Sequence, residues 1–189
     1  VDIRLRAADT TLIEQSEGTI RDAIGEHIFG VDNEKLEQNI IRLLTDRKET
    51  LVVAESCTGG YLANRLTNVP GASAVFLAGL VTYSNEAKQV VLGVKAGTLA
   101  AHGAVSEVTA CEMAEGARNR HGATYALATT GIAGPGGRTQ EKPVGTVHIA
   151  LSTPDGTHTI NPCNAVDRET FKFVASQQAL ELLRGKLVE

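Results

Sequence analysis

The sequence predicts an α/β protein with a mixed sheet covered by helices on both faces, preceded by a short strand and helix. Apolar runs of strand length alternate with segments whose apolar residues recur at helical spacing. Residues that can cap helices or form turns separate these segments. The alternation starts near Gly30, so we expect residues 1–30 to be the tail of a preceding region and residues 31–189 to form one domain.

The expected elements can be placed along the chain in order. Val1, Ile3 and Leu5 alternate with charged residues, which predicts a half-buried strand, and Asp9 can cap the helix that follows. The domain is then expected to contain helices over residues 36–46, 59–67, 84–92 and 106–122, strands over residues 51–54, 74–83, 123–129, 144–153 and 157–161, and a final helix after Asp167. Asp155-Gly156 predicts a hairpin turn between the last two strands.

Composition and charge exclude several classes of protein. The 189 residues are 42% hydrophobic and 21% charged, which argues against disordered and fibrous chains. The net charge is −4 and no basic cluster is present, so nucleic acid is not an expected partner. No apolar run is long enough to span a membrane and no signal peptide is recognisable, so we expect a cytoplasmic protein without a membrane partner.

Two further counts bear on compartment and completeness. Three cysteines without a CxxC pair argue against a disulfide framework and a zinc ribbon, and they suit a reducing compartment. The chain begins at Val1 and its only methionine is Met113, so we expect a fragment of a longer protein.

The first candidate site segment, AESCTGG, lies where a strand gives way to a helix, the usual place of sites in open α/β sheets. Gly59 and Gly60 allow the backbone to approach a ligand, and N–H groups from Thr58 onward can hold an anion or an oxyanion. Ser56 is therefore a candidate nucleophile, with Cys57 as the alternative. The competing interpretation is a helix cap and a tight turn.

The second segment, YSNEAK, places a tyrosine at a strand end and a lysine one turn into a helix. A partly desolvated Lys88 near the positive end of that helix could be neutral enough to take a proton from a serine hydroxyl. Tyr83 could donate to an oxyanion or relay a proton. The competing interpretations are a solvated surface lysine and a strand-end aromatic residue.

The third segment, TTGIAGPGG, begins with Thr129 and Thr130 and contains four glycines directly after a strand: Gly131, Gly134, Gly136 and Gly137. Backbone N–H groups of glycine loops form sites for phosphate or carboxylate, and Lys142 could add a positive charge. The spacing matches neither a Walker loop nor a dinucleotide fingerprint.

Histidines offer one rival to the lysine and no metal site. His102 precedes a glycine, as a helix C-terminal residue does, and remains a rival general base. The other four show no metal-ligand spacing with one another or with cysteine, namely His27, His121, His148 and His158. We therefore expect no metal and no other cofactor.

The three segments, together with HGAVSE and EKPVGTV, resemble the CinA C-terminal domain family of nicotinamide-nucleotide amidohydrolases. The resemblance covers roughly residue 36 to the C-terminus. It implies a three-layer sandwich, a homodimer, and hydrolysis of the carboxamide of nicotinamide mononucleotide to nicotinate mononucleotide and ammonia in pyridine-nucleotide recycling. It also implies that residues 1–30 are the tail of the middle region of full-length CinA proteins.

Family members use a serine and a lysine, and the matching positions are Ser56 and Lys88, with Tyr83 and Thr130 nearby. We expect Ser56 to attack the carboxamide while Lys88 carries its proton to the leaving group. The loop after Ser56 would hold the oxyanion and the glycine loop the phosphate, or the reverse. The alternatives are a non-catalytic nucleotide-binding or interaction module of a competence or damage-inducible protein, and another small-amide or phosphate-ester hydrolase.

Overall fold

Buried apolar runs and caps assemble into a single mixed sheet in the computed structural model, which describes residues 2–189. The strands are β1 (Leu51–Glu55), β2 (Phe76–Val81), β3 (Tyr125–Gly131), β4 (Val147–Thr153) and β5 (Gly156–Ile160), in the spatial order β2-β1-β3-β4-β5. Strand β1 pairs in parallel with β2 and β3, whereas the β3–β4 and β4–β5 pairs are antiparallel. This arrangement confirms the predicted mixed sheet.

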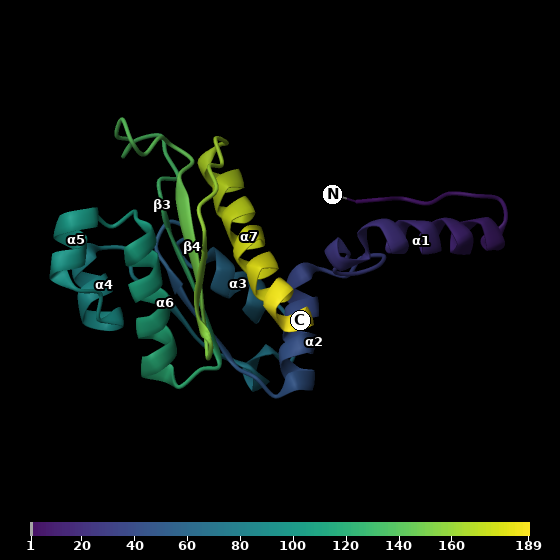
Figure 1. Ribbon diagram of the computed structural model, residues 1–189, viewed down its shortest axis with the longest axis horizontal. Helices are drawn as coiled ribbons and strands as arrows, with labels where there is room; N and C mark the ends of the chain where they lie inside the picture. The colour runs from purple at the N-terminus through teal and green to yellow at the C-terminus, as the bar shows by residue number, and fades with distance from the viewer. Residues whose placement is uncertain (1) are drawn as a thin grey trace.

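Helices cover both faces of the sheet and complete three layers (Figure 1). The helices are α1 (Thr10–Ile24), α2 (Leu36–Arg47), α3 (Tyr61–Thr67), α4 (Asn85–Leu92), α5 (Ala96–His102), α6 (Glu107–His121) and α7 (Arg168–Val188), with short 3-10 turns at Gly25–His27 and Ala72–Ala74. One apolar cluster packs α2, α3 and α7 on one face, and a second packs α4, α5 and α6 on the other. Every residue of β1 is buried, because β1 lies between two other strands and helices cover both faces of the sheet.

Most helix starts follow the predicted caps. Ser84 accepts a hydrogen bond from the Ala87 N–H at the start of α4, and Ser106 and Asp167 cap α6 and α7 in the same way. For α5, the sequence predicted only that His102 ends a helix, and the rest of this helix was not predicted. Helix α3 begins at residue 61 rather than 59. Among residues 2–189, no helix is long and apolar enough to cross a bilayer.

The strand expected at the N-terminus is not formed over the described residues. Val1 lies outside them, and residues 2–7 have no regular secondary structure. Alternation alone does not make a strand, because the backbone also needs a neighbouring strand to pair with, and Figure 1 shows this segment running beside α1, away from the sheet. Ile3 accordingly stays 54% exposed. The predicted helix is confirmed as α1, capped by Asp9, and none of its residues is buried.

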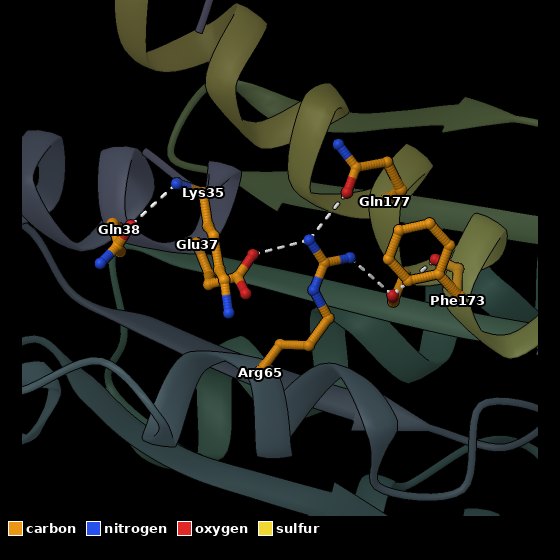
Figure 2. Close-up of polar contacts among 7 residues, drawn as sticks. Lys35, Glu37, Gln38, Arg65, Phe173 and Gln177 are labelled. Atoms are coloured by element: carbon orange, nitrogen blue, oxygen red, sulfur yellow. Dashed lines mark hydrogen bonds and ion pairs between the residues drawn. The ribbon is translucent and has the colours of Figure 1, made fainter. Parts of the chain in front are cut away.

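The three helices on one face are joined by a buried arginine (Figure 2). Arg65 of α3 donates to Glu37 Oε2 of α2 at 2.7 Å, and to Ser176 Oγ at 2.8 Å and Gln177 Oε1 at 2.7 Å on α7. Its guanidinium also lies 5.4 Å from the centre of the Phe173 ring. The side chains of Arg65 and Glu37 are only 9% and 11% exposed, so each depends on the other for its charge partner.

Replacing this arginine tests how far the helices depend on it. We expect Arg65→Met to lower the free energy of unfolding by about 3–5 kcal/mol, because the substitution leaves the Glu37 carboxylate buried without its partner. Arg21→Met is the matched control, since Arg21 pairs with Glu17 in solvent, and it should cost less than about 1 kcal/mol. Urea unfolding of both variants measures the difference, and equal losses would contradict the assigned role.

Candidate active site

The predicted segments meet around one cavity of about 280 Å³ at the carboxyl ends of β1, β2 and β3. Its polar side comprises Ser56, Tyr83, Lys88, Thr130 and Arg168. Its remaining lining comprises Cys57, Ala104, Val105, Gly131, Ile132, Ala133, Gly134, Gly136 and Gly137. The topology explains the meeting, because β1 lies between β2 and β3 and all three run in the same direction.

The turn that carries Ser56 is held by a buried carboxylate. Glu55, the last residue of β1, is fully buried, and its side chain accepts N–H bonds from Gly60 (2.9 Å), Leu62 (3.1 Å) and Ala63 (2.8 Å). These bonds satisfy the free N–H groups at the start of α3. The N-terminus of α3 therefore already holds the side chain of Glu55, and Ser56 is fixed at the start of the turn that leads into this helix.

Lys88 brings its amine to Ser56. It lies in α4, only 1% exposed, with Nζ 3.0 Å from Ser56 Oγ. Nζ also donates to the carbonyl oxygens of Thr82 (2.8 Å) and Tyr83 (3.3 Å). Burial lowers the pKa of Lys88, because the charged ammonium loses its hydration. No carboxylate forms an ion pair with it among residues 2–189.

The two rivals for these roles are less well placed. Cys57 lines the cavity, but burial raises the pKa of its thiol to about 12, so little thiolate is present near neutral pH. His102 is exposed at the end of α5 and is not part of the cavity lining. Geometry therefore favours Ser56 and Lys88 over both alternatives.

Thr130 and Tyr83 reach the cavity from different segments, and an arginine that sequence reasoning missed joins one of them. Thr130 Oγ1 donates to the Ala104 carbonyl at 2.7 Å. Arg168, the first residue of α7, donates to Tyr83 Oη at 3.0 Å and to the Gly134 carbonyl at 2.8 Å. A positive charge is unfavourable in the first turn of a helix, and that position is the signal by which Arg168 could have been found.

Four residues predicted to bind substrate lie outside the cavity lining: Thr58, Gly59, Gly60 and Lys142. The N–H of Gly59 donates to the Ser56 carbonyl (3.2 Å) and that of Gly60 to Glu55, so neither is available to a ligand. The Thr58 hydroxyl pairs with Thr129, whereas the N–H groups of Cys57 and Thr58 make no hydrogen bond within residues 2–189. These two donors replace the glycines as candidates to hold an oxyanion. Lys142 Nζ instead donates to the His102 carbonyl at 3.0 Å.

The glycine loop does line the cavity with its four glycines. Gly134 has a φ of +76°, and a Cβ atom there would lie 2.6 Å from Val144 Cγ1, so packing requires glycine. The N–H groups of Gly134, Gly136 and Gly137 have no hydrogen-bond partner in the described part of the chain. They are open to an anion. Within residues 2–189, no three His, Cys, Asp or Glu side chains are grouped as metal ligands.

The Glu55 cap can be tested by an isosteric change. We expect Glu55→Gln to lower the free energy of unfolding by about 1–3 kcal/mol, because the amide nitrogen of glutamine cannot accept the N–H bonds that the second carboxylate oxygen accepts. Glu141→Gln, at an exposed loop residue, should change it by less than about 0.5 kcal/mol. Thermal and urea unfolding provide the comparison, and an unchanged Glu55→Gln protein would refute the role of this cap.

Known proteins share this fold and much of this sequence. A CinA-like protein from Frankia casuarinae is 50% identical over 184 residues, which are 97% of this chain and 42% of that protein. The chain spans less than half the length of the curated relatives it matches, from 42% to 44% for three of them.

Solved structures agree with these sequence relationships. The competence/damage inducible protein CihA from Agrobacterium tumefaciens has a TM-score of 0.80 and 43% identity, covering 86% of this chain and 99% of that one. The competence damage-inducible protein A (ComA) from Klebsiella pneumoniae has a TM-score of 0.79 and 42% identity, covering 82% and 96%. The family model of the CinA C-terminal domain matches residues 33–187. The chain therefore belongs to the CinA C-terminal domain family.

Proposed function

We propose that this chain hydrolyses the carboxamide of nicotinamide mononucleotide to nicotinate mononucleotide and ammonia, with Ser56 as nucleophile and Lys88 as general base. The observation that carries the proposal is the 3.0 Å contact between Lys88 Nζ and Ser56 Oγ at a lysine that is 1% exposed. The serine-lysine mechanism that the family resemblance implies needs this contact. A serine hydroxyl is a weak nucleophile on its own, and a neighbouring base that takes its proton activates it for attack on an amide.

Three oxygen atoms surround Nζ, namely Ser56 Oγ and the carbonyls of Thr82 and Tyr83. In the charged form, Nζ donates to all three. Once Lys88 is neutral, its two N–H bonds can go to the carbonyls, and its lone pair then accepts from the Ser56 hydroxyl. Lys88 accepts the hydroxyl proton as Ser56 Oγ attacks the carboxamide carbon.

The oxyanion and the leaving group have matching partners. The free N–H groups of Cys57 and Thr58 follow Ser56 directly and would hold the oxyanion of the tetrahedral intermediate. Because the Thr130 hydroxyl gives its proton to Ala104, its oxygen is left to accept an N–H bond from the carboxamide. Lys88 returns the proton to the nitrogen, ammonia leaves, and water hydrolyses the ester formed on Ser56 with Lys88 again as base.

The rest of the cavity has groups that can bind the pyridine ring and the phosphate of the proposed substrate. Its apolar wall, Ala104, Val105, Ile132 and Ala133, can pack against a pyridine ring. Arg168 and the free N–H groups of the glycine loop can bind a phosphate. Since Glu55 already fills the N-terminus of α3, the glycine loop is the better phosphate site and the turn after Ser56 the better oxyanion site.

Ammonia release from nicotinamide mononucleotide tests the proposal. We expect turnover by the wild-type chain and at least about a 10³-fold loss of kcat in Ser56→Ala, which removes the nucleophile. Lys88→Met should lose about 10²–10⁴-fold, because the base is removed. Ser73→Ala, at an exposed serine outside the cavity, is the matched control and should turn over normally.

Other outcomes would redirect the assignment. Turnover that survives Ser56→Ala but disappears in Cys57→Ala would make the thiol the nucleophile. Binding of nicotinamide mononucleotide without turnover in the wild-type chain would favour the non-catalytic nucleotide-binding module.

A further inference from the structure

We propose that Gly116 and Arg120 of α6 are positioning residues for the catalytic lysine. They determine how closely α4 packs on α6, and through α4 they hold the amine of Lys88 beside Ser56. The inference rests on the proposed function only for the role of Lys88. Neither residue lines the cavity, so both would act through α4.

Gly116 is a glycine in the interior of a 15-residue helix, where alanine is the more stable choice. Packing explains the exception. A Cβ atom at position 116 would lie 1.8 Å from the carbonyl oxygen of Leu92 and 2.9 Å from its carbonyl carbon. Both atoms belong to the backbone at the last residue of α4, so no side-chain rotation could relieve the overlap.

Arg120 lies one turn further along α6, on the same face as Gly116. Its Nη1 atom donates to the Val90 carbonyl of α4 at 2.8 Å. Its Nη2 atom lies 3.3 Å from where a Cβ of Gly93, the residue after α4, would be. Gly116 and Arg120 therefore contact consecutive parts of the same helix end, Val90 to Gly93.

The contacted end of α4 is tied to Lys88. Leu92 and Lys88 are four residues apart, on one face of a helix of eight residues. Leu92 is 2% exposed within the apolar cluster of this face, and Val94 N donates to the Lys88 carbonyl at 3.2 Å. Because these contacts join the two residues within one helix, we expect a displacement of Leu92 to displace Lys88 as well.

An alanine at position 116 would therefore act on the Ser56–Lys88 pair. The Leu92 carbonyl would have to retreat by more than about 1 Å to reach ordinary van der Waals separation. A shift of that size lengthens the 3.0 Å contact between Nζ and Oγ and lets water reach the amine. Misplacing a catalytic group by about 1 Å can cost about 10²-fold in rate.

The pH profile distinguishes positioning from simple loss of stability. The rate rises with pH as Lys88 becomes neutral, and hydration of the amine would raise its pKa and move that rise to higher pH. The titratable groups that share the cavity with Lys88 are Cys57, Tyr83 and Arg168. A Cys57 thiolate would also raise the pKa of Lys88, and α6 adds the charge of Arg120 at the far end of α4. None of the three cavity groups is changed by a substitution at position 116.

The experiment compares Gly116→Ala with Gly185→Ala, a control in α7 where an added Cβ meets nothing within 4 Å. Two readouts are measured between pH 6 and 10, namely kcat and KM for nicotinamide mononucleotide, and the rate at which a sulfonyl fluoride modifies Ser56. For Gly116→Ala we expect kcat to fall about 10- to 100-fold with KM within about twofold, and both profiles to move to higher pH. Gly185→Ala should stay within about twofold of the wild type in every readout.

Each outcome decides the proposal. Arg120→Met removes the donor to the Val90 carbonyl and should also move both profiles to higher pH. This second variant keeps the proposal testable if Gly116→Ala does not fold. Profiles of Gly116→Ala or Arg120→Met that coincide with those of Gly185→Ala would overturn the inference. If the sulfonyl fluoride modifies Ser56 of the wild-type chain but this chain releases no ammonia from nicotinamide mononucleotide, the proposed substrate is wrong. A modification profile that moves to higher pH in Gly116→Ala would still support the positioning role.

Discussion

Burial of a lysine amine that pairs with no carboxylate in residues 2–189 is the constraint on which the site depends. Removing an ammonium from water is costly unless it is paired, and a protein avoids that cost by favouring the neutral form. At Lys88, carbonyl groups surround Nζ and burial lowers its pKa. The third polar group beside Nζ is the hydroxyl of Ser56. Burial that favours the neutral amine therefore allows Lys88 to accept the proton of the nucleophile.

The fold supplies this constraint through the order of its strands. Because β1 lies between β2 and β3, the residues that follow these three parallel strands meet at one edge. Glu55 and Thr129 fix the turn that carries Ser56, and the end of β2 leads directly into α4. The lysine then depends on how α4 packs against α6, on the opposite face of the sheet from α3 and α7. The two reacting groups are thus held by different layers of the sandwich.

Sequence reasoning predicts those features that local chemistry decides. Caps such as Ser84 and Asp167, the buried run of β1 and the three site segments are all visible in the sequence, because each depends on neighbours within a few residues. The strand expected at Ile3 and Leu5 fails because pairing needs a distant partner. Arg168 was missed for a similar reason, since its hydrogen-bond partners lie up to 85 residues away. The capping role of Glu55 was missed even though its N–H partners lie only five to eight residues further along the chain. Gly59 and Gly60 suggested ligand contacts, but Glu55 and the Ser56 carbonyl use their N–H groups.

Direct titration of the Lys88 amine tests the central claim most closely. Nuclear magnetic resonance of lysine-labelled protein, assigned by comparison with Lys88→Met, would give the pKa of Lys88. We expect this pKa to lie below the ordinary value of a lysine, because burial disfavours the charged ammonium. A Lys88 pKa at or above the ordinary value would contradict the account, because a fully charged Lys88 could not accept the proton of Ser56.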